Sequence, residues 1–267
     1  VSITNTQQAA DVEFCLIQQQ AHKVKPMLLR LDGIWFNSEQ DYKQQNAPIR
    51  YAYNNADVVV FQSNFNKLLT ESWFGEHKNS HVVHNAADLK LVNASNKRFW
   101  DRKFGINTEL WSCASNWRPH KRLKDNIDYF NQHAPEDAQL AIAGNVDSID
   151  MTDLKLNKRI HFLGELDYMS LLSLYRKSST FVHLAFLDHC PNVVVDAQAC
   201  GCHVICSSTG GTKEVVTNGT IIIEKEWDYT PIKLYKPPAI DFNNKLEKQT
   251  DIKNCIVKCS KKYYNLL

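Results

Sequence analysis

Residues 180–206, T-F-V-H-L-A-F-L-D-H-C-P-N-V-V-V-D-A-Q-A-C-G-C-H-V-I-C, decide the fold class. Two short apolar runs, at residues 180–184 and 203–206, have the length and composition of buried β-strands. A helical pattern over residues 193–200 lies between them and follows Pro191, and proline is favoured where helices begin. Strand, helix and strand in this order predict a βαβ unit of a parallel sheet.

The same alternation continues on both sides of this unit. Leu123, Ile127 and Phe130 recur at helical spacing, which predicts an amphipathic helix packed on a sheet. The further predicted elements are strands at residues 110–114, 139–143, 160–163 and 220–223 and helices at residues 123–133 and 168–177. Together they predict an α/β fold in which helices cover a parallel sheet.

The first hundred residues show a weaker form of this pattern. Short apolar runs occur at residues 12–16, 26–31, 57–61 and 81–84. They predict a second α/β domain that is small for a complete Rossmann domain, and the polar stretch 91–106 is the predicted linker. We therefore divide the chain into an N-terminal domain, a C-terminal α/β domain and a helical cap, at residues 1–105, 106–235 and 236–267.

The composition is that of an ordinary globular chain, 43% hydrophobic and 22% charged. With 31 basic and 29 acidic residues, the net charge of +2 gives no sign of nucleic-acid binding, which needs a clustered positive excess. No apolar run approaches the length of a membrane span, and residues 1–20 lack the pattern of a secretory signal. We therefore expect a cytoplasmic protein without a transmembrane segment.

Eight cysteines are present, and most lie inside apolar runs, so buried free thiols in a reducing compartment are expected. Cys200, Cys202, His203 and Cys206 form a group that invites a metal hypothesis. Their spacing matches no paired zinc framework, and Cys206 ends a predicted strand. No metal site is therefore predicted.

Two carboxylates flank the start of the helix that follows Pro191. Asp188 is expected at the carboxyl end of a strand, where open α/β sheets bind ligands, and Asp196 farther along the helix. The amides around Asn192 and Val193 are expected to direct the positive end of the helix dipole at an anion or a polar sugar. This arrangement favours a nucleotide-sugar, because one carboxylate can accept hydrogen bonds from sugar hydroxyls and the other from the ribose.

This segment resembles the E-x7-E signature of the family 4 (group 1) retaining glycosyltransferases, which have the GT-B fold. The family's E-G-F-P-N-V-x-x-E-A-x-A-C-G-x-P-V is matched in spacing by D-H-C-P-N-V-V-V-D-A-Q-A-C-G-C-H-V at residues 188–204. Asp188 and Asp196 replace both glutamates, and His189 stands where the family prefers glycine. Shorter carboxylates imply altered contacts to the sugar and the ribose. The resemblance also assigns Pro191 to the donor site.

Two further segments match the family in order. Residues 209–216, T-G-G-T-K-E-V-V, resemble its G-G-x-x-E-V-V turn, in which Gly210 and Gly211 let the backbone approach the donor. In the loop after residue 114, Lys121 takes the position of the family's diphosphate-binding lysine. The arginine position falls near Asn116, and Arg118 is expected to reach the phosphates instead. Two cations are needed because the family uses no metal and the departing diphosphate builds up negative charge.

The resemblance extends into the N-terminal region and spans residues 25–225. Residues 56–63 resemble the family's A-D-x-V-I-x-x-S strand, and residues 83–88 resemble its I-P-N-G-V-D segment. It implies two Rossmann-like domains with parallel sheets flanked by helices, of which the N-terminal one is small or incomplete. Arg30 and Asp32, at the end of a predicted strand, are the candidates for contact with the acceptor.

The implied activity is metal-independent transfer of a sugar from a nucleoside diphosphate sugar to an acceptor hydroxyl, with retained anomeric configuration. Lys121 and Arg118 would neutralise the leaving diphosphate, and Asp188 would orient the sugar. No cofactor is expected besides the donor substrate, and the acceptor is a glycan, a lipid or a protein. Two alternatives stay open: a sugar-nucleotide epimerase on the same fold, and a non-catalytic nucleotide-sugar-binding module.

Overall fold

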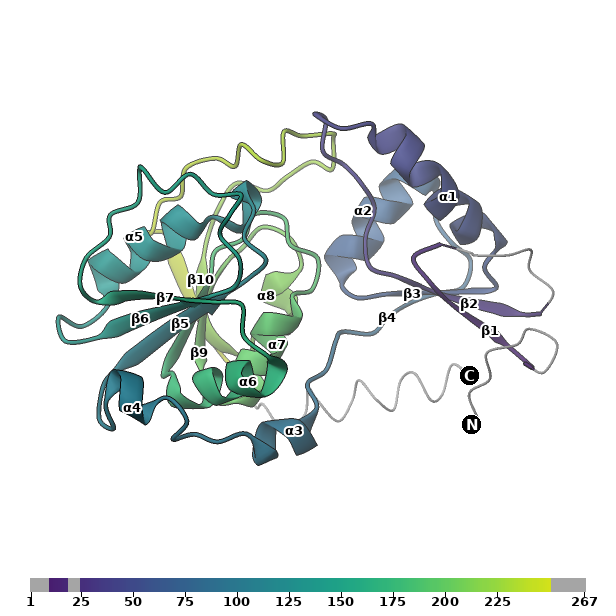
Figure 1. Cartoon of the computed structure of the whole chain (residues 1–267). Helices are drawn as coiled ribbons and strands as arrows, with labels where there is room; N and C mark the ends of the chain where they lie inside the picture. Colours follow the sequence, from purple (N-terminus) through teal and green to yellow (C-terminus); the bar gives the residue numbers. More distant parts are fainter. Residues whose placement is uncertain (1–9, 19–24, 251–267) are drawn as a thin grey trace. The chain divides into compact units, whose positions relative to one another are not determined.

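The computed structural model of the chain describes residues 10–18 and 25–250. These residues form two compact units, each built around its own sheet (Figure 1). Of the described residues, the first unit holds those up to Asn85 together with Trp227–Leu234, and the second holds Ala86–Glu226 and residues 235–250.

The sheet of the first unit has the strand order β1-β2-β3-β4, and all of its neighbouring strands are parallel. Its elements are β1 (Glu13–Leu16), β2 (Met27–Leu31), α1 (Tyr42–Asn55), β3 (Val58–Phe61), α2 (Asn64–Phe74) and β4 (Ser80–Val82). Ser63 starts α2, because its side chain accepts a hydrogen bond from the Asn66 amide. The expected apolar runs 12–16, 26–31 and 57–61 each contain a strand, and the run 81–84 overlaps β4.

The chain returns to the first unit after the last parallel strand of the second. Ile232 forms a β-bridge with Asn37, and the Trp73 indole donates a 2.7 Å hydrogen bond to the carbonyl of Tyr229. These contacts group residues 227–234 with the first unit, whereas their position in the sequence had assigned them to the second domain. Local periodicity carries no signal for such a return.

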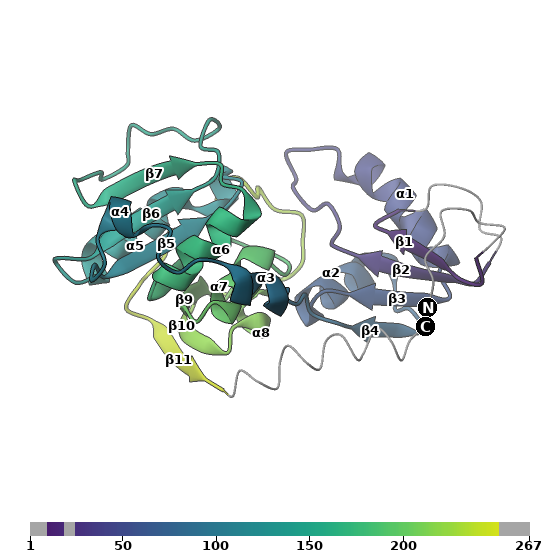
Figure 2. The same cartoon turned by 60° about the horizontal axis from the view of Figure 1, so that its bottom comes forward.

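The sheet of the second unit has the strand order β11-β10-β9-β8-β5-β6-β7. Its strands are β5 (Leu110–Ala114), β6 (Gln139–Ala143), β7 (Ile160–Gly164), β8 (Thr180–His183), β9 (His203–Ser207), β10 (Asn218–Ile222) and β11 (Lys245–Gln249). The pairs are parallel except for β11, which runs antiparallel to β10 at the edge of the sheet (Figure 2). The parallel α/β prediction is confirmed.

Helices cover both faces of this sheet (Figure 1). They are α5 (Leu123–His133), α6 (Tyr168–Lys177), α7 (Asn192–Ala199) and the short α8 (Thr212–Val215). Successive strand residues alternate between two cores, so that Leu140 and Ile142 pack with α5 and Ala141 and Ala143 pack with α6 and α7. Burial on both faces explains why these strands read as continuous apolar runs.

The predicted linker is folded against the second unit. It overlaps α3 (Leu89–Ala94) and contains α4 (Asp101–Phe104), and α3 packs beside α6 and α7 (Figure 2). The Trp100 indole donates a 3.1 Å hydrogen bond to the carbonyl of Ser170, and Phe104 is buried. Trp100 and Phe104 therefore pack against the second unit, whereas Phe99 is exposed. In the predicted cap, residues 245–249 form a strand, and residues 251–267 lie outside the described residues.

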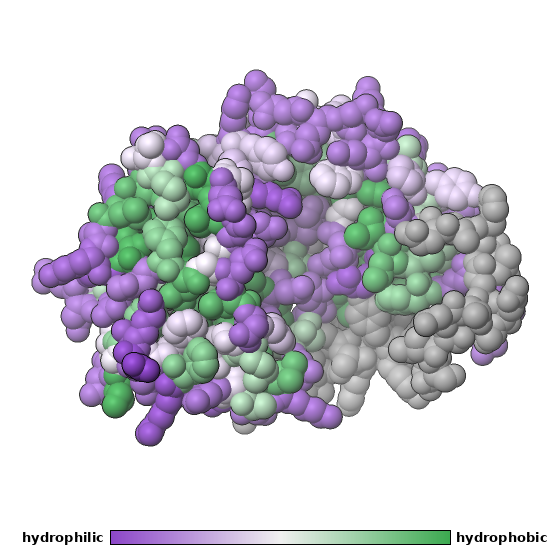
Figure 3. Space-filling model, in the orientation of Figure 1, coloured by the Kyte–Doolittle hydropathy of each residue, from purple (hydrophilic) through white to green (hydrophobic). Residues whose placement is uncertain are grey.

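In the described ranges 10–18 and 25–250, no helix is both long enough and apolar enough to span a bilayer. Figure 3 shows hydrophobic and hydrophilic residues interspersed over the visible face of the second unit. A mixed surface of this kind is ordinary for folded chains.

Candidate active site

The strand order of the second unit reverses between β5 and β8, which is the position of the ligand crevice in open α/β sheets. From β5 the chain continues outward through β6 to β7, and it then returns to β8 on the other side of β5 before continuing to β9 and β10. Ligands of open α/β sheets bind at such a reversal, outside the carboxyl ends of the strands. Here the loop 115–122, after β5, and the loop 184–191, after β8, border this crevice.

A lysine from one loop and an aspartate from the other meet in the crevice. Lys121 Nζ lies 2.5 Å from Asp188 Oδ2, and His183 Nε2 lies 3.0 Å from the same oxygen. The other carboxylate oxygen of Asp188 accepts a 3.0 Å hydrogen bond from the amide of His189. The two residues that the sequence singled out 67 positions apart are thus in direct contact.

The charge state of this cluster follows from its contacts. Burial acts to raise the pKa of Asp188, but the Lys121 ammonium and the His183 hydrogen bond outweigh it and hold that pKa well below its usual range. Burial lowers the pKa of His183, which is therefore neutral near pH 7. Because ionised Asp188 can only accept hydrogen bonds, the proton of His183 is on Nε2.

The Gly210-Gly211 turn packs against the backbone of Asp188. Gly210 has φ +75°, and a Cβ atom there would lie 2.4 Å from the carbonyl oxygen of Asp188. The Gly211 amide donates a 2.7 Å hydrogen bond to that same oxygen. In this structure the glycines permit a close approach to the backbone of Asp188, a role that sequence analysis had not given them.

A buried ion pair anchors the loop that carries Lys121. Arg122, in the left-handed conformation with φ +53°, makes two 2.9 Å hydrogen bonds to the two carboxylate oxygens of Glu224. The side chain of Arg122 is 0% exposed, and it also donates to the carbonyls of Leu184 and Pro238. A bidentate pair of this geometry fixes the backbone next to Lys121.

Asn126 of α5 adds a second anchor. Its side-chain amide donates to the carbonyls of Lys121 and Arg122, at 3.2 and 2.7 Å, and its oxygen accepts from the amide of Leu184. The side chain of Asn126, like that of Arg122, therefore links the two loops that border the crevice.

The start of α7 lies where the sequence predicted a helix. Pro191 is its N-cap, Asn192 its first residue, and Val193 follows in the first turn. Asp196 is buried on the same helix and is hydrogen-bonded to the hydroxyl of Tyr168. Burial raises the pKa of Asp196 to about 6, although the hydrogen bond acts in the opposite direction.

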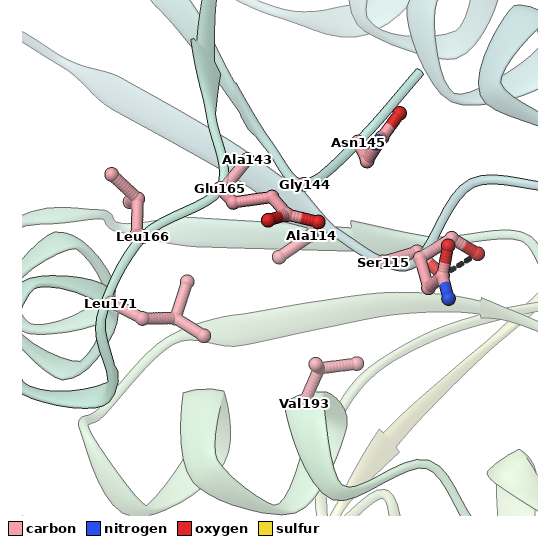
Figure 4. Close-up of a pocket in the computed structure, with 10 residues that line it drawn as sticks. Ala114, Ser115, Ala143, Gly144, Asn145, Glu165, Leu166, Leu171 and Val193 are labelled. Atoms are coloured by element: carbon pink, nitrogen blue, oxygen red, sulfur yellow. Dashed lines mark hydrogen bonds between the residues drawn. The ribbon is translucent and has the colours of Figure 1, made fainter. Parts of the chain in front are cut away.

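A cavity of about 360 Å³ lies at the carboxyl ends of β5, β6 and β7 (Figure 4). This volume is within the range of small-molecule sites, about 300–1,000 Å³. The cavity is lined by Ala114, Ser115, Asn116, Ala143, Gly144, Asn145, Glu165, Leu166, Leu171 and Val193. Two predicted donor-site residues, Asn116 and Val193, thus face the same space.

Arg118 is exposed at the start of the 3-10 helix η2 (Pro119–Lys121). In the described part of the chain, no hydrogen bond or ion pair holds its side chain, so the cluster contains Lys121 without Arg118. The two predicted cations therefore differ, because one is fixed in place and the other extends into solvent.

The acceptor-side candidates lie in the first unit. Arg30, in β2, is ion-paired with Asp32, and its guanidinium also donates a 2.7 Å hydrogen bond to Asn85. Asn85 in turn donates to Gln62, just after β3. This polar group gathers at the carboxyl ends of β2, β3 and β4, the edge at which parallel sheets bind ligands.

Residues 10–18 and 25–250 contain no cluster of three His, Cys, Asp or Glu side chains that could hold a metal ion. No disulfide joins the six described cysteines, Cys15, Cys113, Cys190, Cys200, Cys202 and Cys206, to one another. Burial raises the pKa of Cys200 to about 12. A thiol with so high a pKa is protonated at neutral pH and behaves as a packing residue.

A model of the family described as glycosyl transferases group 1 matches residues 96–231. The chain belongs to this family. The resemblance found in the sequence is thereby confirmed, and the matched region contains Lys121, Asp188, Asp196 and the Gly210-Gly211 turn.

Two curated relatives resemble about two thirds of the chain. One is the GDP-mannose-dependent monoacylated alpha-(1-6)-phosphatidylinositol monomannoside mannosyltransferase of Corynebacterium glutamicum, 25% identical over 192 residues, which are 66% of this chain and 50% of the relative. The other is the N-acetyl-alpha-D-glucosaminyl L-malate synthase of Bacillus anthracis, 27% identical over 183 residues, 65% of this chain and 47% of the relative. The chain spans about half the length of these relatives.

Solved structures of glycosyltransferases share the fold. HepE of Anabaena in complex with UDP-glucose superposes with a TM-score of 0.62 at 20% identity, over 76% of this chain and 59% of that one. The sucrose-phosphate synthase of Thermosynechococcus elongatus superposes with a TM-score of 0.66 at 15% identity, over 96% of this chain and 65% of that one. These likenesses confirm the predicted GT-B fold with its parallel, helix-flanked sheets.

Four residues that shape the site had no role in the prediction from the sequence: His183, Arg122, Glu224 and Glu165. His183 could have been noticed in the sequence, because it is a polar residue inside an apolar strand. No local pattern marks the second and third, because Arg122 and Glu224 are 102 positions apart.

Proposed function

We propose that this chain is a retaining, metal-independent glycosyltransferase that moves a sugar from a nucleoside diphosphate sugar to an acceptor hydroxyl. The observation that carries the proposal is the ion pair of Lys121 and Asp188 at the reversal point of the parallel sheet. It holds an ammonium group beside the first turn of α7, where the donor diphosphate of this family would lie. Retention of configuration is supported by the resemblance to the E-x7-E family.

Each residue has a role in this proposal. The Lys121 ammonium, the exposed Arg118 and the amides at the start of α7 stabilise the negative charge that grows on the departing diphosphate. Protein cations then supply the charge that a metal ion supplies in other transferases. Asp188 positions Lys121 and accepts hydrogen bonds from the sugar, and Asp196 accepts them from the ribose. Gly210 and Gly211 fix Asp188.

The carboxyl-end cluster of Arg30 and Asp32 is proposed to contact the acceptor. The acceptor is a glycan, a lipid or a protein that bears a free hydroxyl group. A cytoplasmic location is supported by the buried thiols of Cys113, Cys202 and Cys206, because thiols that form no disulfide persist in reducing compartments.

The test is turnover of radiolabelled nucleoside diphosphate sugars by the Lys121→Ala variant. Removing one group that stabilises the developing charge costs about 100- to 1,000-fold in kcat. Lys124→Ala is the matched control, because Lys124 is an exposed lysine three positions along the chain that pairs with Asp128. Turnover should also be unaffected by EDTA. Undiminished turnover by Lys121→Ala would remove Lys121 from the mechanism.

A further inference from the structure

The residues that line the cavity of about 360 Å³ indicate which nucleobase it could bind. Among the described residues that line it, Glu165 alone is ionisable. Leu166, Leu171, Ala114 and Val193 form apolar walls. These walls can pack against a flat ring, and the carboxylate can accept hydrogen bonds from donors on the edge of that ring.

Glu165 is exposed at the wall of the cavity, so its carboxylate is available to a ligand. It lies in the middle of the lining residues, over Ala114 and between the leucines and Ser115 (Figure 4). Within the described part of the chain, no hydrogen bond or ion pair engages it.

We infer that Glu165 selects a guanine nucleotide as the donor. This inference rests on the proposed function, in which the diphosphate lies at Lys121 and the first turn of α7. Val193 belongs both to that turn and to the wall of the cavity, so a nucleotide held there extends its base towards Glu165.

The hydrogen-bonding edges of the bases decide the preference. Guanine presents two adjacent donors, N1–H and N2–H, which match the two acceptor oxygens of a carboxylate. Uracil presents one N–H between two carbonyl oxygens, which a carboxylate repels. Cytosine and adenine present an amino donor next to a ring nitrogen that is an acceptor. Only guanine can therefore use both oxygens of Glu165 at once.

Binding of GDP, UDP, ADP and CDP to the full chain, measured by isothermal titration calorimetry, tests this inference. We expect GDP to bind at least about tenfold more tightly than the others, as expected for a bidentate base contact. Glu165→Gln replaces one acceptor oxygen by an amino donor and should weaken GDP binding about 10- to 100-fold, with UDP binding changed less than threefold. Glu136→Gln, at an exposed position in the loop before β6, is the matched control and should change neither.

The outcomes separate this inference from the proposed function. If UDP or ADP binds as tightly as GDP, or if Glu165→Gln weakens all four nucleotides equally, the selection by Glu165 is wrong while donor binding stands. If no nucleoside diphosphate binds the folded wild-type chain, the proposed function fails together with the inference. A melting curve of each variant without nucleotide confirms that the fold is retained.

Discussion

Asp196 should lower the stability of the folded chain at neutral pH, and its replacement by asparagine should raise it. Burial raises the pKa of this carboxyl to about 6 from an ordinary value of 3.8. Between these two values the unfolded chain has released a proton that the folded chain retains, so stability falls as the pH rises through this window. Above about pH 6 the full cost of the buried charge is present.

The size of this cost follows from the two pKa values. Their difference of roughly two pKa units, at about 1.36 kcal/mol for each unit, gives an upper limit of about 3 kcal/mol. The hydrogen-bonding partner Tyr168 is 42% exposed, so solvent screens the carboxylate in part. We therefore expect Asp196→Asn to stabilise the chain by about 2 kcal/mol at pH 8.

Thermal unfolding of the wild type and of Asp196→Asn at pH 8 and at pH 4 measures this effect. At pH 8 the variant should melt about 4–8 °C higher, since 1 kcal/mol moves Tm by about 2–4 °C in domains of this size. At pH 4 the difference should largely vanish, because the wild-type carboxyl is then protonated in the folded chain. Asp137→Asn, at an exposed position before β6, is the matched control and should leave Tm unchanged.

The same substitution should reduce nucleotide affinity, because the proposed ribose contact loses a charged acceptor. If Asp196→Asn is more stable than the wild type but binds the nucleotide less tightly, the Asp196 carboxylate lowers stability and is needed for binding. If Asp196→Asn were less stable than the wild type at pH 8, or if its advantage persisted unchanged at pH 4, the argument from burial would be refuted.

Two further substitutions test the support of the site. Gly210→Ala should lower the free energy of unfolding by about 2–4 kcal/mol and reduce donor turnover, because the new Cβ would collide with the backbone of Asp188. Gly201 also has a positive φ, but a Cβ there would meet open space. Gly201→Ala should therefore lower the free energy of unfolding less, as measured by urea titration. Arg122→Met should lower the free energy of unfolding by about 3–5 kcal/mol, because it leaves the buried carboxylate of Glu224 unpaired. The double variant Arg122→Met/Glu224→Leu should recover much of that loss. If the double variant were no more stable than the single one, the loss would not come from the unpaired charge.

Much of the second unit could be predicted from the sequence. The predicted strands 110–114 and 139–143 and the predicted helices 123–133 and 168–177 agree with the structure residue for residue. These elements are buried on one or both faces, and the periodicity of their apolar residues is a local property. The stretch 91–106 was harder, because its polar residues resemble a linker while Trp100 and Phe104 pack against the second unit.

Part of the candidate site was also predicted from the sequence, and part was identified only in the structure. Spacing in the sequence marked Asp188, Lys121 and the Gly210-Gly211 turn, and the structure brings them together. It does not bring Arg118 into the cluster. It adds Glu165, which has no distinguishing pattern in the sequence and becomes informative because it lines a cavity.

The sequence by itself therefore determined the order and type of the elements, the family and the short motif around α7, because these depend on neighbouring residues. Only the tertiary structure decided which charged groups meet. Lys121 and Arg122 are adjacent in one basic run, yet one is directed to Asp188 in the crevice and the other is buried against Glu224. Their partners come from strands and loops far along the chain, and the pairing depends on the order of strands in the sheet, which no local pattern contains.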